Sequence, residues 1–114
     1  MITISEQSGY ITAINIFRVK PEDQQRLVDF LVENKDMPLK HPGCLSVSIH
    51  KSLDGSRVIN YIQWRSREEL EAAGKDPDFT AVKKQVAELA PLDSHFYEVV
   101  FTAQTQSLVR SADR

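Results

Sequence analysis

Two side chains in the segment "DGSRVINYIQW" (residues 54–64) could take part in chemistry. Asn60 carries an amide and Trp64 an indole N–H, within a run that reads as a β-strand after a turn. Because the side chains of a strand alternate between its two faces, both point to the same face, with Ile62 between them. Polar groups of this kind on an otherwise apolar face are typical of a pocket for a flat polar ligand.

A second amide lies in the first predicted strand. Asn15 is central in "YITAINIFR" (residues 10–18), a segment rich in β-branched residues. A buried amide without partners costs on the order of 1–3 kcal/mol, so these positions need an explanation. On spacing alone two interpretations stay open. Either each Asn satisfies nearby backbone and Trp64 is a core aromatic, or the three groups converge on a ligand.

Length and composition describe one small globular domain. The chain has 114 residues, of which 41% are hydrophobic and 26% charged. Its net charge of -2 argues against a nucleic-acid partner or an anionic membrane. The single Cys44 excludes an internal disulfide. The chain begins without a signal-like segment, and no apolar stretch approaches the roughly 20 residues that span a bilayer. We therefore expect a cytoplasmic protein without a membrane partner.

The predicted elements follow the order strand, helix, strand, strand, helix, strand. Ser66 with Glu69 forms a capping box, and Asp76 with Pro77 begins a further helix, which splits the second helical region in two. This order predicts an α+β, ferredoxin-like βαββαβ domain whose four-stranded antiparallel sheet carries helices on one face. The expected strands are 10–18, 44–52, the segment ending at residue 64, and 95–103. We expect the domain to span 10–103, between an N-terminal extension (1–9) and a C-terminal tail (104–114).

The hairpin at Asp54-Gly55 predicts how the second and third strands pair. An even loop opposes Ile49 to Asn60 and Leu45 to Trp64, which keeps the apolar residues on one face. Together with the helices, this face would form the wall of the pocket. The expected substrate-binding residues are Leu45, Val47, Ile49, Val58, Ile62, Phe79 and Val82.

The other face of the sheet is too apolar to be fully exposed to solvent. It would hold Ile59 and Tyr61 beside Ser46, Ser48 and other polar residues. A second copy packed sheet against sheet is the simplest cover, so we expect a homodimer that forms a dimeric α/β barrel.

Other chemistry-bearing residues form no recognisable pattern. No metal-ligand spacing, Gly-rich phosphate loop or nucleophile elbow is present. His41 is expected in a loop, and His50 and His95 in strands that face solvent or the dimer. Lys83 and Lys84 are expected on a solvated helix face.

The stretch "HPGCLSVSIHKSLDGSRVINYIQWRSREELEAAGKDPDF" resembles the antibiotic biosynthesis monooxygenase family, and most closely its cofactor-independent anthrone monooxygenases. The most specific match comprises Asp54, Gly55, Asn60, Tyr61, Gln63 and Trp64. The resemblance implies that Asn60 and Trp64, with Asn15 as a further candidate, are the catalytic residues. This chain has Leu70 where those relatives carry a Tyr, which removes a phenolic hydrogen bond.

The resemblance implies oxidation of an anthrone-like polycyclic aromatic, or a related quinol, to a quinone. The partners would be a small aromatic substrate and O2, with no cofactor and no metal. Three alternatives stay open: a heme-degrading monooxygenase, an isomerase of the same fold, and a non-catalytic small-molecule-binding dimer. A heme enzyme of this fold would need a His near position 83, where this chain has Lys83.

Overall fold

The computed structural model describes residues 4–7 and 9–105 of the chain, so most of the expected tail (104–114) lies outside the described residues. Within the described residues the strands and helices follow the predicted order, with one addition: a short helix, α2, precedes the second strand at a place where the sequence predicted the end of the first helix and a loop. The elements are β1 (Ile11–Arg18), a 3-10 turn (Pro21–Asp23), α1 (Gln24–Glu33), α2 (Asp36–Leu39), β2 (Cys44–Lys51), β3 (Arg57–Trp64), α3 (Arg67–Gly74), α4 (Pro77–Leu89) and β4 (Leu92–Tyr97).

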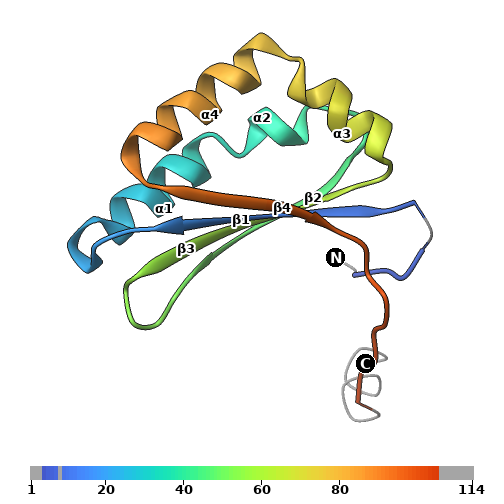
Figure 1. The fold of residues 1–114 in the computed structure, drawn as a ribbon, viewed down its shortest axis with the longest axis horizontal. Coiled ribbons are helices and arrows are strands. Elements are labelled where there is room, and N and C mark those ends of the chain that lie inside the picture. Colours follow the sequence, from blue (N-terminus) through green and yellow to red (C-terminus); the bar gives the residue numbers. More distant parts are fainter. Residues whose placement is uncertain (1–3, 8, 106–114) are drawn as a thin grey trace, which may run out of the picture.

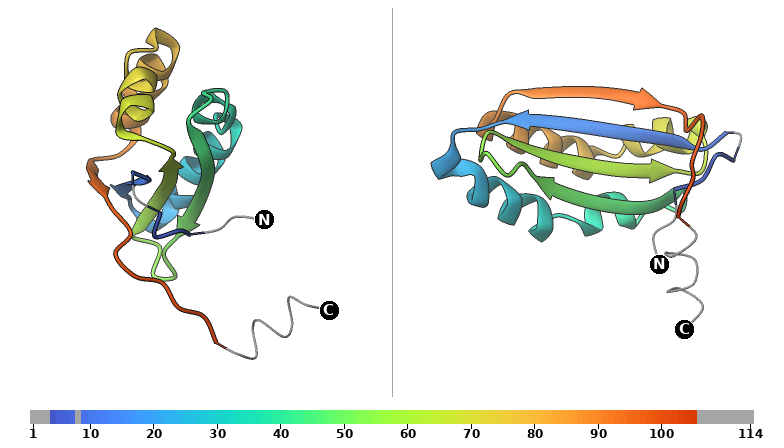
Figure 2. Two further views of the ribbon diagram at one scale, coloured as in Figure 1. Left: turned by 90° about the vertical axis from the view of Figure 1, so that its right-hand side faces the viewer. Right: turned by 90° about the horizontal axis from the view of Figure 1, so that it is seen from below.

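The strands form one antiparallel sheet in the order β2-β3-β1-β4. All the helices lie on the same face of this sheet (Figure 1), with α1 and α2 over one side and α3 and α4 over the other (Figure 2, left). This confirms the predicted ferredoxin-like α+β architecture. Among the described residues, no helix has the length and apolar character needed to cross a membrane.

Local signals in the sequence set the ends of the helices. Ser66 Oγ accepts a hydrogen bond from the backbone N–H of Glu69 (3.2 Å) and donates one to Glu69 Oε1 (3.1 Å), which confirms the capping box of α3. Asp76 caps α4 by accepting from the N–H of Asp78 (2.9 Å), and Pro77 occupies the first turn. These two caps define the residues at which α3 and α4 begin after the end of β3.

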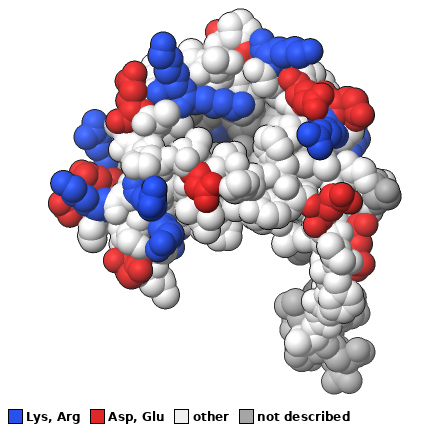
Figure 3. Space-filling model, viewed as in Figure 1, with Lys and Arg blue, Asp and Glu red and all other residues white. Residues whose placement is uncertain are grey.

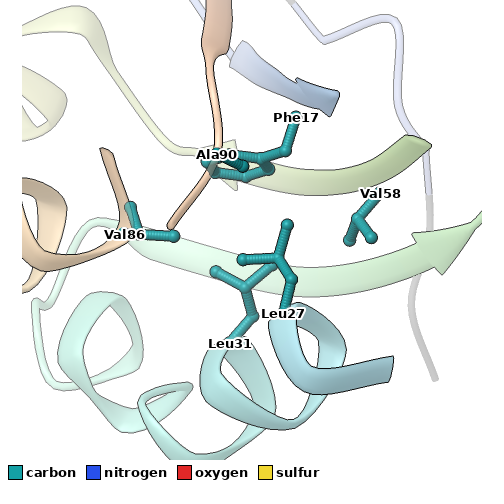
Figure 4. Close-up of a cluster of buried hydrophobic side chains, with 6 residues drawn as sticks. All are labelled: Phe17, Leu27, Leu31, Val58, Val86 and Ala90. Atoms are coloured by element: carbon teal, nitrogen blue, oxygen red, sulfur yellow. The ribbon is translucent and has the colours of Figure 1, made fainter. Parts of the chain in front are cut away.

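Two hydrophobic clusters join the sheet to the helices. The first packs α1 and α4 against the end of the sheet where β1 ends and β3 begins; it comprises Phe17, Leu27, Leu31, Val58, Val86 and Ala90 (Figure 4). The second lies nearer the start of α4 and comprises Ala13, Ile62, Trp64, Ala73 and Phe79. A cavity remains between these clusters, lined by members of both.

Two boundaries differ from the prediction. A β-bulge lies between Cys44 and Ser46, so that Cys44 pairs with Trp64 and the predicted pairing of Leu45 with Trp64 is wrong, whereas Ile49 does oppose Asn60. The last strand begins three residues earlier than expected and ends at Tyr97. Tyr97 pairs with Thr12 near the first residue of β1, so beyond Tyr97 the chain has no partner strand to pair with.

The face of the sheet away from the helices carries both terminal segments at one end (Figures 1 and 2). Glu6 joins them, because its Oε2 accepts from the backbone N–H and from Oγ1 of Thr102, each at 3.1 Å. On the same face Ser46 Oγ donates to Gln63 Oε1 (3.0 Å), and both residues are buried. The rest of this outer face is the expected dimer surface.

Candidate functional site

A cavity of about 160 Å³ lies between the helix-covered face of the sheet and the helices. The sheet supplies its floor: Ala13, Asn15, Phe17, Val47, Asn60, Ile62, Leu92, Ser94 and Phe96. The helices and the residues between them supply the walls: Leu31, Asn34, Lys35, Met37 and Pro38 on one side, and Phe79, Val82, Lys83 and Val86 on the other. Apolar side chains dominate this lining, as is usual for small-molecule sites.

The two predicted amides meet on the cavity floor. Asn15 and Asn60 are direct partners across the β1–β3 ladder, and Ser94 pairs with Asn15 from the opposite side. Ser94 Oγ donates to Asn15 Oδ1 at 2.6 Å. The carbonyl oxygen of Asn15 is thereby engaged, which leaves its NH2 group to donate to a ligand.

Buried polar atoms without partners mark the same region. Among the described residues, neither Asn60 Oδ1 nor Trp64 Nε1 has a hydrogen-bond partner, although both atoms are inaccessible to solvent. Each such group costs on the order of 1–3 kcal/mol. The interpretation in which each Asn satisfies nearby backbone therefore fails at Asn60, and Trp64 is a core aromatic whose N–H finds no carbonyl.

Not every predicted pocket residue lines the cavity. Val47, Ile62, Phe79 and Val82 do so. Leu45 does not, because the β-bulge turns it outward, where it is 42% exposed. Ile49 and Val58 face the helices, but they pack in the first hydrophobic cluster and do not line the cavity.

Trp64 is also placed differently from the prediction. It is 1% exposed and packs in the second hydrophobic cluster with Phe79 and Ala73, behind the cavity lining. Phe79 belongs both to this cluster and to the lining, so the cluster that contains the indole lies directly behind the cavity wall. Cys44 pairs with Trp64 at this end, and burial raises the pKa of its thiol, which disfavours a nucleophilic thiolate.

No sequence pattern predicted that His41 lies near the site. Its ring lies 5.8 Å from the ring of Phe79 and 6.4 Å from that of Trp64, and its Nε2 is 3.0 Å from Asp76 Oδ2. Burial acts to raise the pKa of Asp76, but the N–H of Asp78 and the ammonium of Lys40 outweigh it and lower that pKa. Through their contacts with Asp76, His41 and Lys40 connect the segment before β2 to the N-terminus of α4. Only the fold brings these loop and helix residues together.

Lys83 differs from the expected solvated helix residue, because it lines the cavity. Its Nζ lies 4.4 Å from the centroid of the Phe79 ring, which is the geometry of a cation–π contact. Lys84, the next residue, is exposed and is not part of the lining. Within the described residues no group of three His, Cys, Asp or Glu side chains could hold a metal ion.

These features define a class of protein: a ferredoxin-like α+β domain whose sheet and helices enclose an apolar cavity with hydrogen-bonding amides on its floor. The model of the family "Antibiotic biosynthesis monooxygenase" matches residues 10–85. Tetracenomycin-F1 monooxygenase of Streptomyces glaucescens is 42% identical over 78 residues, which are 68% of this chain and 70% of the relative. The chain belongs to the antibiotic biosynthesis monooxygenase family.

Solved structures share the fold. The ActVA-Orf6 monooxygenase of Streptomyces coelicolor, in complex with nanaomycin D, superposes with a TM-score of 0.76 at 24% identity and covers 86% of this chain and 93% of its own. SnoaB, a cofactor-independent oxygenase from Streptomyces nogalater, gives a TM-score of 0.70 at 16% identity, over 87% and 98% of the two chains. The family and its relatives support monooxygenation as the class of reaction.

Proposed function

We propose that this protein is a cofactor-independent monooxygenase that oxidises an anthrone-like polycyclic aromatic, or a related quinol, to a quinone. The observation that carries the proposal is the pair Asn15 and Asn60, directly opposed on the floor of an apolar cavity. The names of the relatives support it, since one acts on tetracenomycin F1 and another binds nanaomycin D.

The chemistry asks little of the protein beyond charge stabilisation and shielding from water. An anthrone has an acidic CH2 opposite its carbonyl, and loss of one proton gives an electron-rich enolate. The enolate passes one electron to O2, and the resulting radical and superoxide combine into a carbon-bound peroxide. Loss of water from the peroxide leaves a second carbonyl, so that CH2 and O2 become C=O and H2O.

The cavity residues fit the roles that this reaction requires. The amide NH2 groups of Asn60 and Asn15 donate hydrogen bonds to the oxyanion of the enolate. Removal of one such donor in other enzymes costs about 2.7–4 kcal/mol of transition-state stabilisation. Trp64 positions the aromatic substrate by holding Phe79 in the wall, and the apolar lining excludes water from the reactive intermediates.

The observed positions of the histidines favour this reaction over heme degradation. His50 and His95 lie on strand positions that face away from the helices, and His41 is absent from the cavity lining. A heme-degrading enzyme of this fold would place its iron ligand on α4, where the cavity has Lys83.

The test is oxygen uptake by the purified, metal-free protein with a panel of anthrones, followed together with quinone absorbance. We expect one quinone per O2 consumed, a fall of about 10²-fold in kcat for Asn60→Ala, and reduced turnover for Trp64→Phe. Gln85→Ala, which removes an exposed amide from α4, is the matched control and should turn over normally. A wild-type rate equal to the spontaneous rate would overturn the proposal and favour a binding module.

A further inference from the structure

The cavity is positively charged although the chain as a whole is negative. Lys35 follows α1 on one wall, and Lys83 lies on α4 on the other. No Asp or Glu is among the cavity-lining residues of the described chain, whereas the net charge of the protein is -2. The positive charge at this site is therefore local and is not a consequence of composition.

The two lysines also differ from other basic residues near the helices. Lys40 pairs with Asp76 (3.2 Å), and Arg65 pairs with Glu69 (2.6 Å). In the part of the chain that the structure describes, neither Lys35 nor Lys83 forms an ion pair.

Lys83 has lost part of its hydration without gaining an anion. Its ammonium contacts the face of the Phe79 ring, and although the residue as a whole is exposed, burial lowers the pKa of its amine. A desolvated cation gains more from a nearby anion than a fully hydrated one does, because the effective dielectric constant is lower there. Figure 3 shows basic side chains at the edge of the hollow between the helices and the sheet.

We propose that the cavity binds an aromatic ligand that carries an anionic oxygen group, a carboxylate or an ionised phenol. The flat ring system lies against Phe79 and Ile62, and the anionic group binds Lys83, with Lys35 as a second cation across the opening. This proposal extends the proposed function, because it assigns a negative charge to the substrate. It rests on the proposed function, which identifies the cavity as the substrate site.

The ring and the charge make separable contributions. Burial of the ring system gives affinity in proportion to the apolar area removed from water. The ammonium groups contribute selectivity, since a neutral ligand of the same shape leaves them without a counter-charge. The charge contribution should therefore appear as a difference between two ligands that share one ring system.

The test is calorimetric titration of the full-length protein with anthraquinone-2-carboxylate and with its neutral counterpart, anthraquinone-2-carboxamide. We expect the wild type to bind the carboxylate roughly three- to tenfold more tightly, as fits one charge-assisted contact. Lys83→Gln should abolish most of the preference, Lys35→Gln should reduce it, and Lys83→Arg should keep it. Lys84→Gln removes the same charge from the neighbouring exposed position and should leave the preference intact.

A third ligand distinguishes the two sources of negative charge. 2-Hydroxyanthraquinone, titrated below and above the pKa of its hydroxyl group, shows whether a phenolate is accepted in place of a carboxylate. Equal affinity for the carboxylate and the carboxamide would overturn the proposal, as would an equal loss of preference in Lys84→Gln and Lys83→Gln.

The binding assay fails or succeeds independently of turnover. A carboxylate preference in a protein that consumes no O2 with any anthrone would retain the anion site and overturn the oxygenase proposal. Oxygen uptake by a protein that binds both anthraquinones equally would do the reverse.

Discussion

Ser94 on the edge strand β4 donates a 2.6 Å hydrogen bond to Asn15 Oδ1 on the neighbouring strand β1. The two residues are register partners, and both line the cavity. Because the hydroxyl donates to the carbonyl oxygen in this arrangement, the NH2 group of the Asn15 amide is the end that stays free for a ligand. Ser94 is a positioning residue for Asn15.

Replacement of Ser94 by Ala should lower kcat for anthrone oxidation by roughly three- to tenfold, because the Asn15 amide loses its orienting bond, which is worth about 0.5–1.5 kcal/mol. Ser94→Thr keeps the hydroxyl and should restore most of the rate. The measurement is steady-state oxygen uptake with kcat and KM determined separately.

The control for this prediction is Ser48→Ala, which removes a hydroxyl from β2 on the opposite face of the sheet. It should leave kcat within experimental error of the wild type. An equal fall in kcat for Ser94→Thr and Ser94→Ala would show that Ser94 contributes shape and not orientation.

Local patterns were enough to predict the sheet, the helix caps and the positions of Asn15 and Asn60, because strand alternation and capping depend on residues close in sequence. The error at Leu45 arose from one extra residue in β2, which reverses the alternation beyond it. Ser94 was missed because the last strand was predicted to begin one residue after it. The roles of His41 and Lys83 depend on contacts between distant segments, which no local pattern contains.

The turn between β2 and β3 should lose stability in strong acid. Asp54 Oδ1 accepts hydrogen bonds from Ser56 Oγ (2.6 Å), from Ser56 N (2.9 Å) and from Ser52 Oγ (2.8 Å), which lower the pKa of its carboxyl group to about 2. A carboxyl group whose pKa is lower in the folded state stabilises the fold above its unfolded pKa, and this contribution disappears as the pH falls through about 2.

We therefore expect the unfolding free energy of wild type relative to Asp54→Asn to be constant above about pH 5 and to shrink toward pH 2. Urea denaturation across this range measures the difference, and an NMR titration of the Asp54 carboxyl carbon locates the pKa directly. A midpoint near the ordinary Asp value would contradict the prediction.

The protein is expected to form a homodimer through the outer face of its sheet. Ile14, Ile16, Ile59 and Tyr61 are partly exposed there, on a surface that the helices do not cover. Sedimentation equilibrium should give twice the chain mass of 13.0 kDa. Ile59→Glu should shift the equilibrium to monomer, because it places a charge in the buried interface. Val32→Glu, at an exposed position on α1, should remain dimeric, and a monomeric wild type would refute the expectation.

Gly43→Ala should destabilise the fold by about 1–3 kcal/mol, as is usual for overpacking. A Cβ atom at Gly43 would overlap the Cβ and carboxylate of Glu69, and that side chain cannot move freely because it binds Arg65 Nε (2.8 Å) and Ser66 Oγ (3.1 Å). Gly74→Ala is the matched control. A Cβ there meets no atom within 4 Å, so the variant should be neutral or gain up to about 1 kcal/mol from helix propensity. Thermal denaturation of both variants tests this prediction. Equal melting temperatures for Gly43→Ala and Gly74→Ala would refute the steric argument.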